Sequence, residues 1–339
     1  MKALYYPVWD QLEIRDVDEP APGPGEVIVR VAAVGICGSE LHGFATRAAR
    51  RTPPLIMGHE FCGTVATVGH GVTGVRSGDR VAVNSVISCG RCEECLEGQS
   101  HICREGEVFG TKRPGAFAEL CAAPAATLLP LPRDVSFFQA ALTEPLANAV
   151  HALSLTRQRF PETAVIFGAG TIGLFVLQVL RAAGAFRLVV ADVSDARLEV
   201  ARRLGADATF NPRKDDVVMA VRGLTRDRGA DVAVDAVGAA ETRQAAVGAT
   251  RPGGEIVWLG LHDDPTPLSG FAVVLGERRI SGSFGVTPRD LRAAIGFFAA
   301  GRIELTPWVR TFPLAEGARV FRQLVTAPPQ DYIKAVLLP

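Results

Sequence analysis

The first half of the chain is patterned for β-structure. Residues 26–36 are dense in β-branched side chains and follow a turn-rich Pro and Gly segment, residues 20–25. A second such run, 61–68, is closed by Gly69, and a third, 80–83, follows the turn formed by residues 77–79. Short apolar runs bounded by glycine and proline are typical of strands joined by tight turns. The pattern predicts a β-rich domain whose loops carry function.

The pattern changes near residue 145, where short apolar strands begin to alternate with amphipathic helical segments. This alternation predicts right-handed crossovers and a parallel sheet that is covered on both faces. We expect two domains: residues 1–146 with 288–339 form the β-rich one, and 147–287 the α/β one. The predicted strands of the second half are 164–167, 187–191, 231–236, 255–260, 279–284 and 333–338, and its predicted helices are 171–183, 195–204, 241–250, 289–300 and 314–326.

Composition narrows the possible partners. The 339 residues are 48% hydrophobic and 21% charged, and 36 basic residues balance 36 acidic ones. A net charge of zero offers no field for a nucleic-acid backbone or an anionic membrane. No apolar run approaches the roughly 18 residues that span a bilayer, and the first ten residues do not form a signal peptide. We therefore expect a soluble, cytoplasmic protein that binds neither nucleic acid nor membranes.

A glycine motif opens the second domain. Gly168, Gly170 and Gly173, with Thr171 and Ile172 between the last two, match G-x-G-x-x-G at the junction of a predicted strand and helix. The glycines permit a tight turn, close approach of a pyrophosphate and close packing of helix on strand.

The acid that ends the next predicted strand decides which cofactor is expected. Asp192 lies nineteen residues after Gly173, where a carboxylate would bind the adenosine ribose hydroxyls and repel a 2′-phosphate. NAD is therefore favoured over NADP, although Arg197 remains available to a phosphate.

Seven cysteines are too few for a disulfide scaffold. Four of them, Cys89, Cys92, Cys95 and Cys103, lie within fifteen residues. Four thiolates complete a tetrahedral zinc shell and leave no position for water, which predicts a structural zinc site. Cys62 and Cys121 have no partners by spacing and are interpreted as small core residues.

A second metal site can be assembled from separated residues. Cys37 follows the first predicted strand, His59 and Glu60 precede the second, and Glu144 lies between the two halves of the chain. A cysteine, a histidine and a carboxylate leave one coordination position open, as in catalytic zinc sites. Singly, each has a plainer interpretation: His59 as a hydrogen-bonded structural residue, and Glu144 as a helix cap.

Taken together, these motifs resemble the medium-chain, zinc-dependent alcohol and polyol dehydrogenases over essentially the whole chain. The motifs are residues 37–42, the segment from Gly58 to Gly69, the four-cysteine cluster, residues 144–146 and the glycine turn. Other members have cysteine at the position of Glu144. With glutamate there, the chain resembles the sorbitol, threonine and sugar-alcohol-phosphate dehydrogenase branch of the family. The resemblance implies a GroES-like catalytic domain, a Rossmann cofactor domain, an active site in the cleft between them, and a homodimer or homotetramer formed near residues 279–284.

The same resemblance implies catalytic roles. Cys37 and His59 would hold a catalytic zinc, with Glu60 and Glu144 as shared or alternating ligands. Ser39 would take the substrate's hydroxyl proton and pass it through the cofactor ribose toward His42. The family usually has aspartate where this chain has Glu40, so the orientation of the zinc-bound histidine is in question.

The leading hypothesis is an NAD-dependent zinc dehydrogenase that oxidises a secondary hydroxyl of a polyol, a sugar alcohol or a hydroxy-amino acid. Arg47, Arg50 and Arg51, with Lys112 and Arg113, suggest an anionic polyol as substrate, because arginine suits phosphate or carboxylate, but a solvated arginine-rich loop is the plainer interpretation. The alternatives are a zinc-dependent NADPH aldehyde or ketone reductase, and an inactive nucleotide-binding sensor. The sequence leaves the substrate and the choice between dimer and tetramer open.

Overall fold

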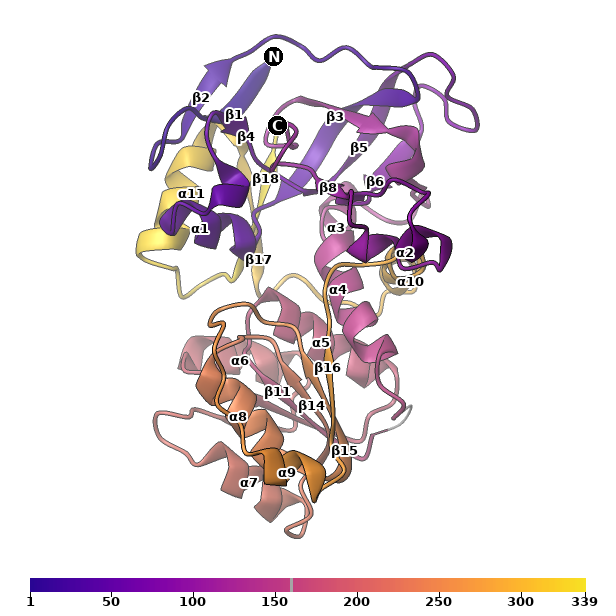
Figure 1. The fold of residues 1–339 in the computed structure, drawn as a ribbon. Coiled ribbons are helices and arrows are strands. Elements are labelled where there is room, and N and C mark those ends of the chain that lie inside the picture. The colour runs from indigo at the N-terminus through magenta and orange to yellow at the C-terminus, as the bar shows by residue number, and fades with distance from the viewer. Residues whose placement is uncertain (159–160) are drawn as a thin grey trace. The chain divides into compact units, whose positions relative to one another are not determined.

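The computed structural model describes residues 1–158 and 161–339 (Figure 1). The chain forms two compact units. The first comprises residues 1–144, 285–301 and 308–339, and the second comprises 145–284 and 302–307. The boundaries expected from the sequence were 146 and 288, and the short segment 302–307 lies with the second unit.

The first unit is built on a mainly antiparallel sheet. Its strands run in the order β10-β6-β5-β3-β18-β17, and β9 also pairs with β3. The central strand β3 is ten residues long and largely buried, which agrees with its β-branched sequence. The strands are β3 (Glu26–Gly35), β5 (Glu60–Val68), β6 (Arg80–Val83), β9 (Leu120–Pro124), β10 (Leu128–Pro130), β17 (Val309–Pro313) and β18 (Lys334–Leu338).

Smaller elements surround this sheet. Two further sheets are β2-β1-β4 and β7-β8, with β1 (Lys2–Tyr6), β2 (Glu13–Asp16), β4 (Leu55–Ile56), β7 (Val86–Ile87) and β8 (Glu107–Val108). The helices are α1 (Gly38–Ala45), α2 (Glu93–Leu96), α3 (Phe137–Ala140), α10 (Pro288–Ala299) and α11 (Gly317–Thr326). Helix α4 (Thr143–Ser154) begins at the end of this unit.

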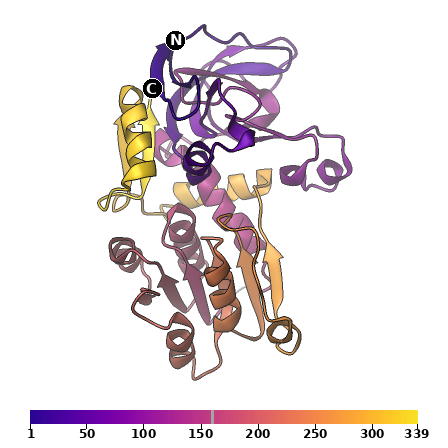
Figure 2. The ribbon, with the colours of Figure 1, turned by 60° about the vertical axis from the view of Figure 1, so that its left-hand side comes forward.

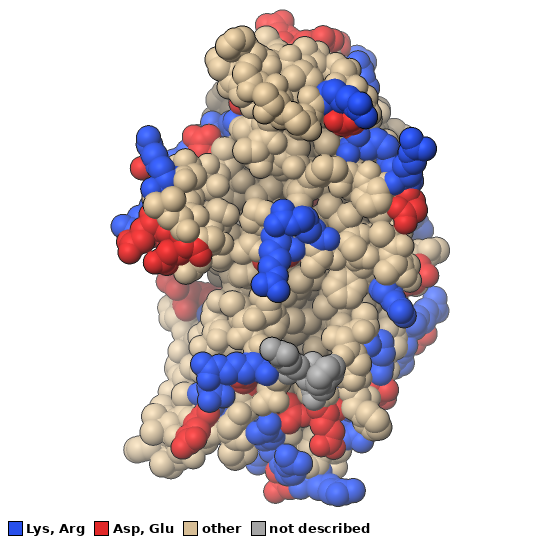
Figure 3. Space-filling view, turned by 90° about the vertical axis from the view of Figure 1, so that its right-hand side faces the viewer, with Lys and Arg blue, Asp and Glu red and all other residues tan. Residues whose placement is uncertain are grey.

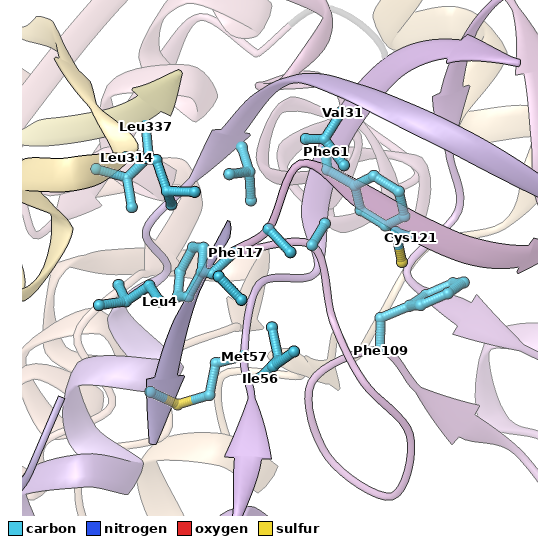
Figure 4. Close-up of a cluster of buried hydrophobic side chains, with 14 of the residues drawn as sticks. Leu4, Val31, Ile56, Met57, Phe61, Phe109, Phe117, Cys121, Leu314 and Leu337 are labelled. Carbon is cyan, nitrogen blue, oxygen red and sulfur yellow. The ribbon is translucent and has the colours of Figure 1, made fainter. Parts of the chain in front are cut away.

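The core of the first unit joins segments that are distant in sequence. Leu4, Phe117 and Leu337 are buried in one cluster, and Figure 4 shows them with Phe61 and Phe109. The rings of Phe61 and Phe109 meet edge to face, with centroids 5.2 Å apart. Cys62 and Cys121 are buried, which confirms their predicted place in the core.

The second unit is a parallel sheet of six strands, in the order β13-β12-β11-β14-β15-β16. Numbered along the chain this is 3-2-1-4-5-6, the order of doubly wound dinucleotide-binding sheets. Helices α5 and α6 pack on β12, and α8 packs on β14 and β15 (Figure 2). The strands are β11 (Thr163–Phe167), β12 (Arg187–Ala191), β13 (Ala208–Phe210), β14 (Ala230–Asp235), β15 (Thr250–Trp258) and β16 (Arg279–Gly282), and the helices are α5 (Thr171–Ala182), α6 (Asp195–Arg203), α7 (Val217–Leu224), α8 (Ala240–Ala249) and α9 (Gly270–Val274).

The predicted fold class is confirmed, and the differences concern individual elements. The sequence pattern missed β13, α7, β1 and β17 because short or edge segments show too few periods of hydrophobic alternation. Strand β15 begins five residues earlier than predicted, in a segment that contains Pro252 and Gly253. Proline and glycine argue against a strand, and the register with β14 shifts there.

No helix in the described part of the chain is both long and apolar enough to cross a membrane. On the face drawn in Figure 3, basic side chains are interspersed with acidic ones, so that face carries no extended field of one sign.

Candidate metal centres and cofactor turn

The four-cysteine cluster forms a compact sulfur site. The Sγ atoms of Cys89, Cys92, Cys95 and Cys103 all lie within 4.8 Å of one another. The Sγ atoms of Cys89 and Cys95 are 4.0 Å apart, and those of Cys92 and Cys103 are 3.7 Å apart. Four sulfurs bound tetrahedrally at about 2.3 Å from zinc would be separated by about 3.8 Å. The geometry fits, and these residues form the structural zinc site.

Local backbone geometry prepares this cluster for a metal. The N–H groups of Cys89 and Cys92 point at the sulfurs of Cys103 and Cys89, each over 3.3 Å. Backbone N–H groups of Arg91 and Cys92 lower the pKa of the Cys89 thiol to about 6, which favours the thiolate that binds metal. The Cys95 N–H lowers the pKa of the neighbouring Cys92 thiol, but burial and the adjacent side chains outweigh it and raise that pKa to about 12. Helix α2 and the following turn, Ser100–Ile102, contain no buried residue. Metal ligation, rather than a hydrophobic core, therefore holds this lobe.

The second group brings together Cys37, His59 and Glu60. One ligand atom from each lies within 4.8 Å of the others. Cys37 precedes α1, while His59 and Glu60 lie at the start of β5, beside the end of β3. Three ligands of this kind leave a coordination position free for a substrate, so this group is the catalytic zinc site.

Glu40 orients the histidine of this site. Its Oε1 lies 2.8 Å from His59 Nδ1 and accepts a bond from Gly58 N over 2.8 Å, while Oε2 accepts from Cys37 N over 3.0 Å. With Nδ1 engaged, Nε2 is the nitrogen that faces the metal position. Glutamate at this position therefore keeps the orienting contact that the sequence left in question.

Both members of this contact have shifted pKa values. Burial raises the pKa of Glu40, but the neighbouring His59 and the Cys37 N–H outweigh it, and the net pKa is lowered. Burial lowers the pKa of His59, and the negative charges of Glu40 and Cys37 raise it well above its usual range. A cation is therefore strongly favoured at this position, and zinc provides one.

Lys334 is a part of the site that sequence reasoning missed. It lies in β18, fully buried, and its Nζ donates to Glu60 Oε2 and, over 2.8 Å, to Ile36 O. Burial lowers the Lys334 pKa, but Glu60 outweighs this and the net pKa is raised. A Cβ atom at Gly35 would lie 2.2 Å from Glu60 Oε2, so any other residue there would displace the carboxylate from its position beside Lys334. The available signal was one lysine in an otherwise apolar run, residues 333–338.

Glu144, the fourth predicted ligand, lies outside the group of three. It is the second residue of α4, and its Oε1 accepts a hydrogen bond from Ser85 Oγ over 3.2 Å. Its ligation of zinc stays a prediction.

The predicted relay residues lie on α1. Ser39 Oγ donates to Cys37 Sγ over 3.3 Å, and His42 follows three residues later with an exposed side chain. Ser39 Oγ also accepts a bond from Arg51 Nη2 over 3.1 Å, which the sequence did not indicate. Arg47, in the same loop, is exposed and forms an ion pair with Asp10 instead.

The glycine turn has the geometry that its motif predicts. Gly168 has a φ of +99°, and a Cβ at Gly173 would lie 1.8 Å from the Gly168 carbonyl oxygen. A Cβ at Gly170 would meet nothing within 4 Å, so the backbone there is open to a ligand. Thr171 and Ile172 begin α5 and are half-buried.

Asp192 connects the turn to the next strand. Its Oδ2 accepts a bond from Ala169 N over 2.7 Å, and Oδ1 accepts from Ser194 N over 2.8 Å. Arg197 Nη1 is 4.0 Å from Asp192 Oδ2. The carboxylate thus supports the glycine turn from the end of β12, where a ribose would be bound.

Two family models match the chain, one within the first unit and one mostly within the second. The model of the "Alcohol dehydrogenase GroES-like domain" matches residues 23–133, and that of "Zinc-binding dehydrogenase" matches 171–300. The chain is 39% identical to L-threonine 3-dehydrogenase of Pyrococcus horikoshii over 253 residues, 74% of this chain and 72% of that one. It is 33% identical to D-arabitol-phosphate dehydrogenase of Enterococcus avium over 324 residues, 94% and 92% of the two chains.

Solved structures agree over the whole length. A zinc-binding dehydrogenase of Sinorhizobium meliloti 1021 bound to NADP superimposes with a TM-score of 0.93 at 32% identity, over 100% of this chain and 99% of that one. An alcohol dehydrogenase of Escherichia coli CFT073 complexed with NADH gives 0.92 at 29% identity, with 100% and 99% covered.

Proposed function

The chain belongs to the zinc-binding medium-chain dehydrogenase family, and on this premise we propose that it oxidises a secondary hydroxyl with NAD. The observation that carries the proposal is the grouping of Cys37, His59 and Glu60, with Glu40 fixing the histidine. We propose a polyol, a sugar alcohol, free or phosphorylated, or a hydroxy-amino acid as the substrate. Relatives named for L-threonine and for D-arabitol phosphate support this range.

The chain's own residues orient the reacting hydroxyl and move its proton. A zinc ion held by Cys37, His59 and Glu60 would lower the pKa of a hydroxyl that binds to it. Ser39 Oγ, 3.3 Å from Cys37 Sγ, accepts the hydroxyl proton. As Ser39 takes this proton, it would pass its own through the cofactor ribose toward His42, which is exposed on the same helix and releases a proton to water. We keep Glu144 in this proposal as a carboxylate that can replace Glu60 at the metal.

We propose NAD as the cofactor, bound by Gly168, Gly170, Thr171, Ile172, Gly173, Asp192 and Arg197. The proposal is supported by the Asp192 carboxylate beside the turn, which would bind the ribose hydroxyls. A 2′-phosphate would meet the same negative charge. The relative bound to NADP and the proximity of Arg197 support the competing NADPH reductase.

The wider organisation follows from the same premise. We propose that residues 1–146 with 288–339 form the catalytic domain and 147–287 the NAD-binding domain. We further propose a cytoplasmic homodimer or homotetramer that associates through β16, the edge strand of the parallel sheet. An edge strand with unpaired backbone groups is suited to pairing with a second copy.

The experiment that tests the function measures NADH formation against threonine, neutral polyols, polyol phosphates and simple alcohols, before and after zinc removal and restoration. We expect turnover with at least one secondary alcohol, lost on chelation and regained with zinc. Cys37→Ser should abolish turnover and remove one zinc per chain while the four-cysteine zinc stays bound. Full activity of that variant would refute the catalytic site, and preference for NADPH with aldehydes would favour the reductase.

A further inference from the structure

We propose that Arg51 binds the anionic group of the substrate, so that the site selects alcohols carrying a carboxylate or phosphate near the reacting hydroxyl. This inference rests on the proposed function and names the feature of the substrate that the site recognises. It concerns one residue of the arginine-rich loop, and the contacts of Arg51 separate it from the others.

Arg51 is buried, and its side chain packs against helix α1. It ends the turn Ala49–Arg51, and only 9% of its surface is exposed. A Cβ at Gly43 would lie 3.1 Å from Arg51 Cδ and 3.4 Å from Nη1, so glycine there makes room for the arginine. Gly43 lies inside α1, where glycine costs about 1 kcal/mol relative to alanine. Alanine there would require the Arg51 side chain to move by a few tenths of an ångström.

The hydrogen-bonding capacity of Arg51 is incompletely used. Nη2 donates to Ser39 Oγ over 3.1 Å, whereas the buried Nε has no hydrogen-bond partner. Among the described residues, no carboxylate lies within 4.0 Å of the guanidinium. The guanidinium does favour the charged form of Glu40 at longer range, but the oxygens of Glu40 are bonded to Cys37, Gly58 and His59. A buried guanidinium without an ion-pair partner is suited to an incoming anion.

Two of the other cations that the sequence grouped with Arg51 are paired with carboxylates of the protein. Arg47 is exposed and pairs with Asp10. Arg113 donates to Glu26 Oε1 over 2.8 Å and lies over the Phe109 ring. Arg47 and Arg113 are therefore engaged within the protein, whereas Arg50 is an exposed residue of the same turn as Arg51.

The position of Arg51 suits a substrate held at the metal. Its Nη2 bonds Ser39 Oγ, which in turn bonds Cys37 Sγ, so the guanidinium is two hydrogen bonds from a zinc ligand. A substrate whose hydroxyl approaches Ser39 would bring a carboxylate or phosphate on a neighbouring carbon toward the guanidinium that bonds the same Ser39 Oγ. The planar fork of arginine matches the oxygens of either group.

The experiment compares Arg51→Gln and Arg51→Lys with Arg50→Gln, an exposed neighbour in the same turn, as the matched control. Each zinc-loaded variant is assayed with a polyol phosphate and its neutral polyol. We expect Arg51→Gln to raise KM for the phosphorylated substrate about 10- to 100-fold, with KM for the neutral polyol and for NAD within twofold. Arg51→Lys should be intermediate, and Arg50→Gln should match the wild type.

A binding measurement is independent of turnover. Inorganic phosphate should raise the thermal midpoint of the wild type and of Arg50→Gln, but not that of Arg51→Gln. This measurement separates the two proposals. If phosphate stabilises the wild-type protein but no alcohol is oxidised, the proposed dehydrogenase function is refuted and the anion site at Arg51 stands.

Three outcomes would overturn the inference. A raised KM for NAD with unchanged substrate KM would assign Arg51 to the dinucleotide phosphates. Equal falls in kcat for neutral and anionic substrates would show that it only positions Ser39. Phosphate protection retained in a folded Arg51→Gln variant would place the anion elsewhere.

Discussion

Each buried carboxylate of the catalytic group has a specific counterpart. Glu40 is bonded to His59 and two backbone N–H groups, and Glu60 is paired with Lys334. Buried charges are costly unless they are paired and hydrogen-bonded. These partners compensate the two carboxylates and hold both side chains in place around Cys37 and His59.

Replacement of Lys334 should expose the cost of this pairing. Lys334→Met leaves the Glu60 carboxylate buried without its cation, which should lower the free energy of unfolding by about 3–5 kcal/mol. Denaturant titration of the metal-free protein measures it. The double variant Lys334→Met with Glu60→Gln should recover part of the loss. A single variant within 0.5 kcal/mol of wild type would show that the pair contributes little.

Two substitutions of Asp192 separate the effect of its charge on cofactor binding from the effect of its hydrogen bond to the glycine turn. Asp192→Ala should raise KM for NAD about 10- to 100-fold and change KM for NADP much less, because it removes the ribose acceptor and the charge that repels a 2′-phosphate. Asp192→Asn is the control, since an amide oxygen can still accept the bond from Ala169 N. Steady-state kinetics with both cofactors decide the point. An unchanged cofactor preference in Asp192→Ala would remove the ribose contact from our proposal.

At the scale of elements, the junction of β11 with α5 combines packing and binding. The glycines of the turn have different roles, because Gly173 faces the Gly168 carbonyl and Gly170 faces open space. The same short motif therefore contains one position that the fold requires and one that a ligand requires.

Two alanine substitutions should separate these roles. Gly173→Ala places a methyl against the Gly168 oxygen and should destabilise the protein by about 3 kcal/mol. Gly170→Ala should leave stability nearly unchanged but weaken NAD binding, because the methyl occupies the space that the pyrophosphate approaches. Thermal unfolding and NAD titration measure the two effects. Equal stability losses in both variants would contradict this division.

At the scale of the whole molecule, both metal groups lie in the first unit, and in the described part of the second no such group is found. Each unit has its own hydrophobic cluster. Ligands that bind the folded state stabilise it by mass action, so zinc should stabilise the first unit selectively.

Chelation should therefore act on one unit. Removal of zinc should lower the unfolding midpoint of the first unit by about 5–10 °C and increase amide exchange around residues 86–108. Hydrogen exchange measured by mass spectrometry, peptide by peptide, reports both units in one sample. Peptides from β11, β12 and β14 serve as the internal control. Equal loss of protection there would show that the two units do not respond separately.

Local patterns in the sequence determined the α/β fold class, the strand–glycine–helix turn and the four-cysteine site, because each depends on residues close together in the chain. Tertiary structure alone decided the rest. Lys334 meets Glu60 across 274 positions, and no periodicity encodes such a contact. The burial of Arg51 and the pairing of Arg47 were likewise decided by packing, since neighbouring arginines look equivalent in sequence. Glu144 accepts a hydrogen bond from Ser85 Oγ across 59 positions of the chain, another contact that no local pattern encodes.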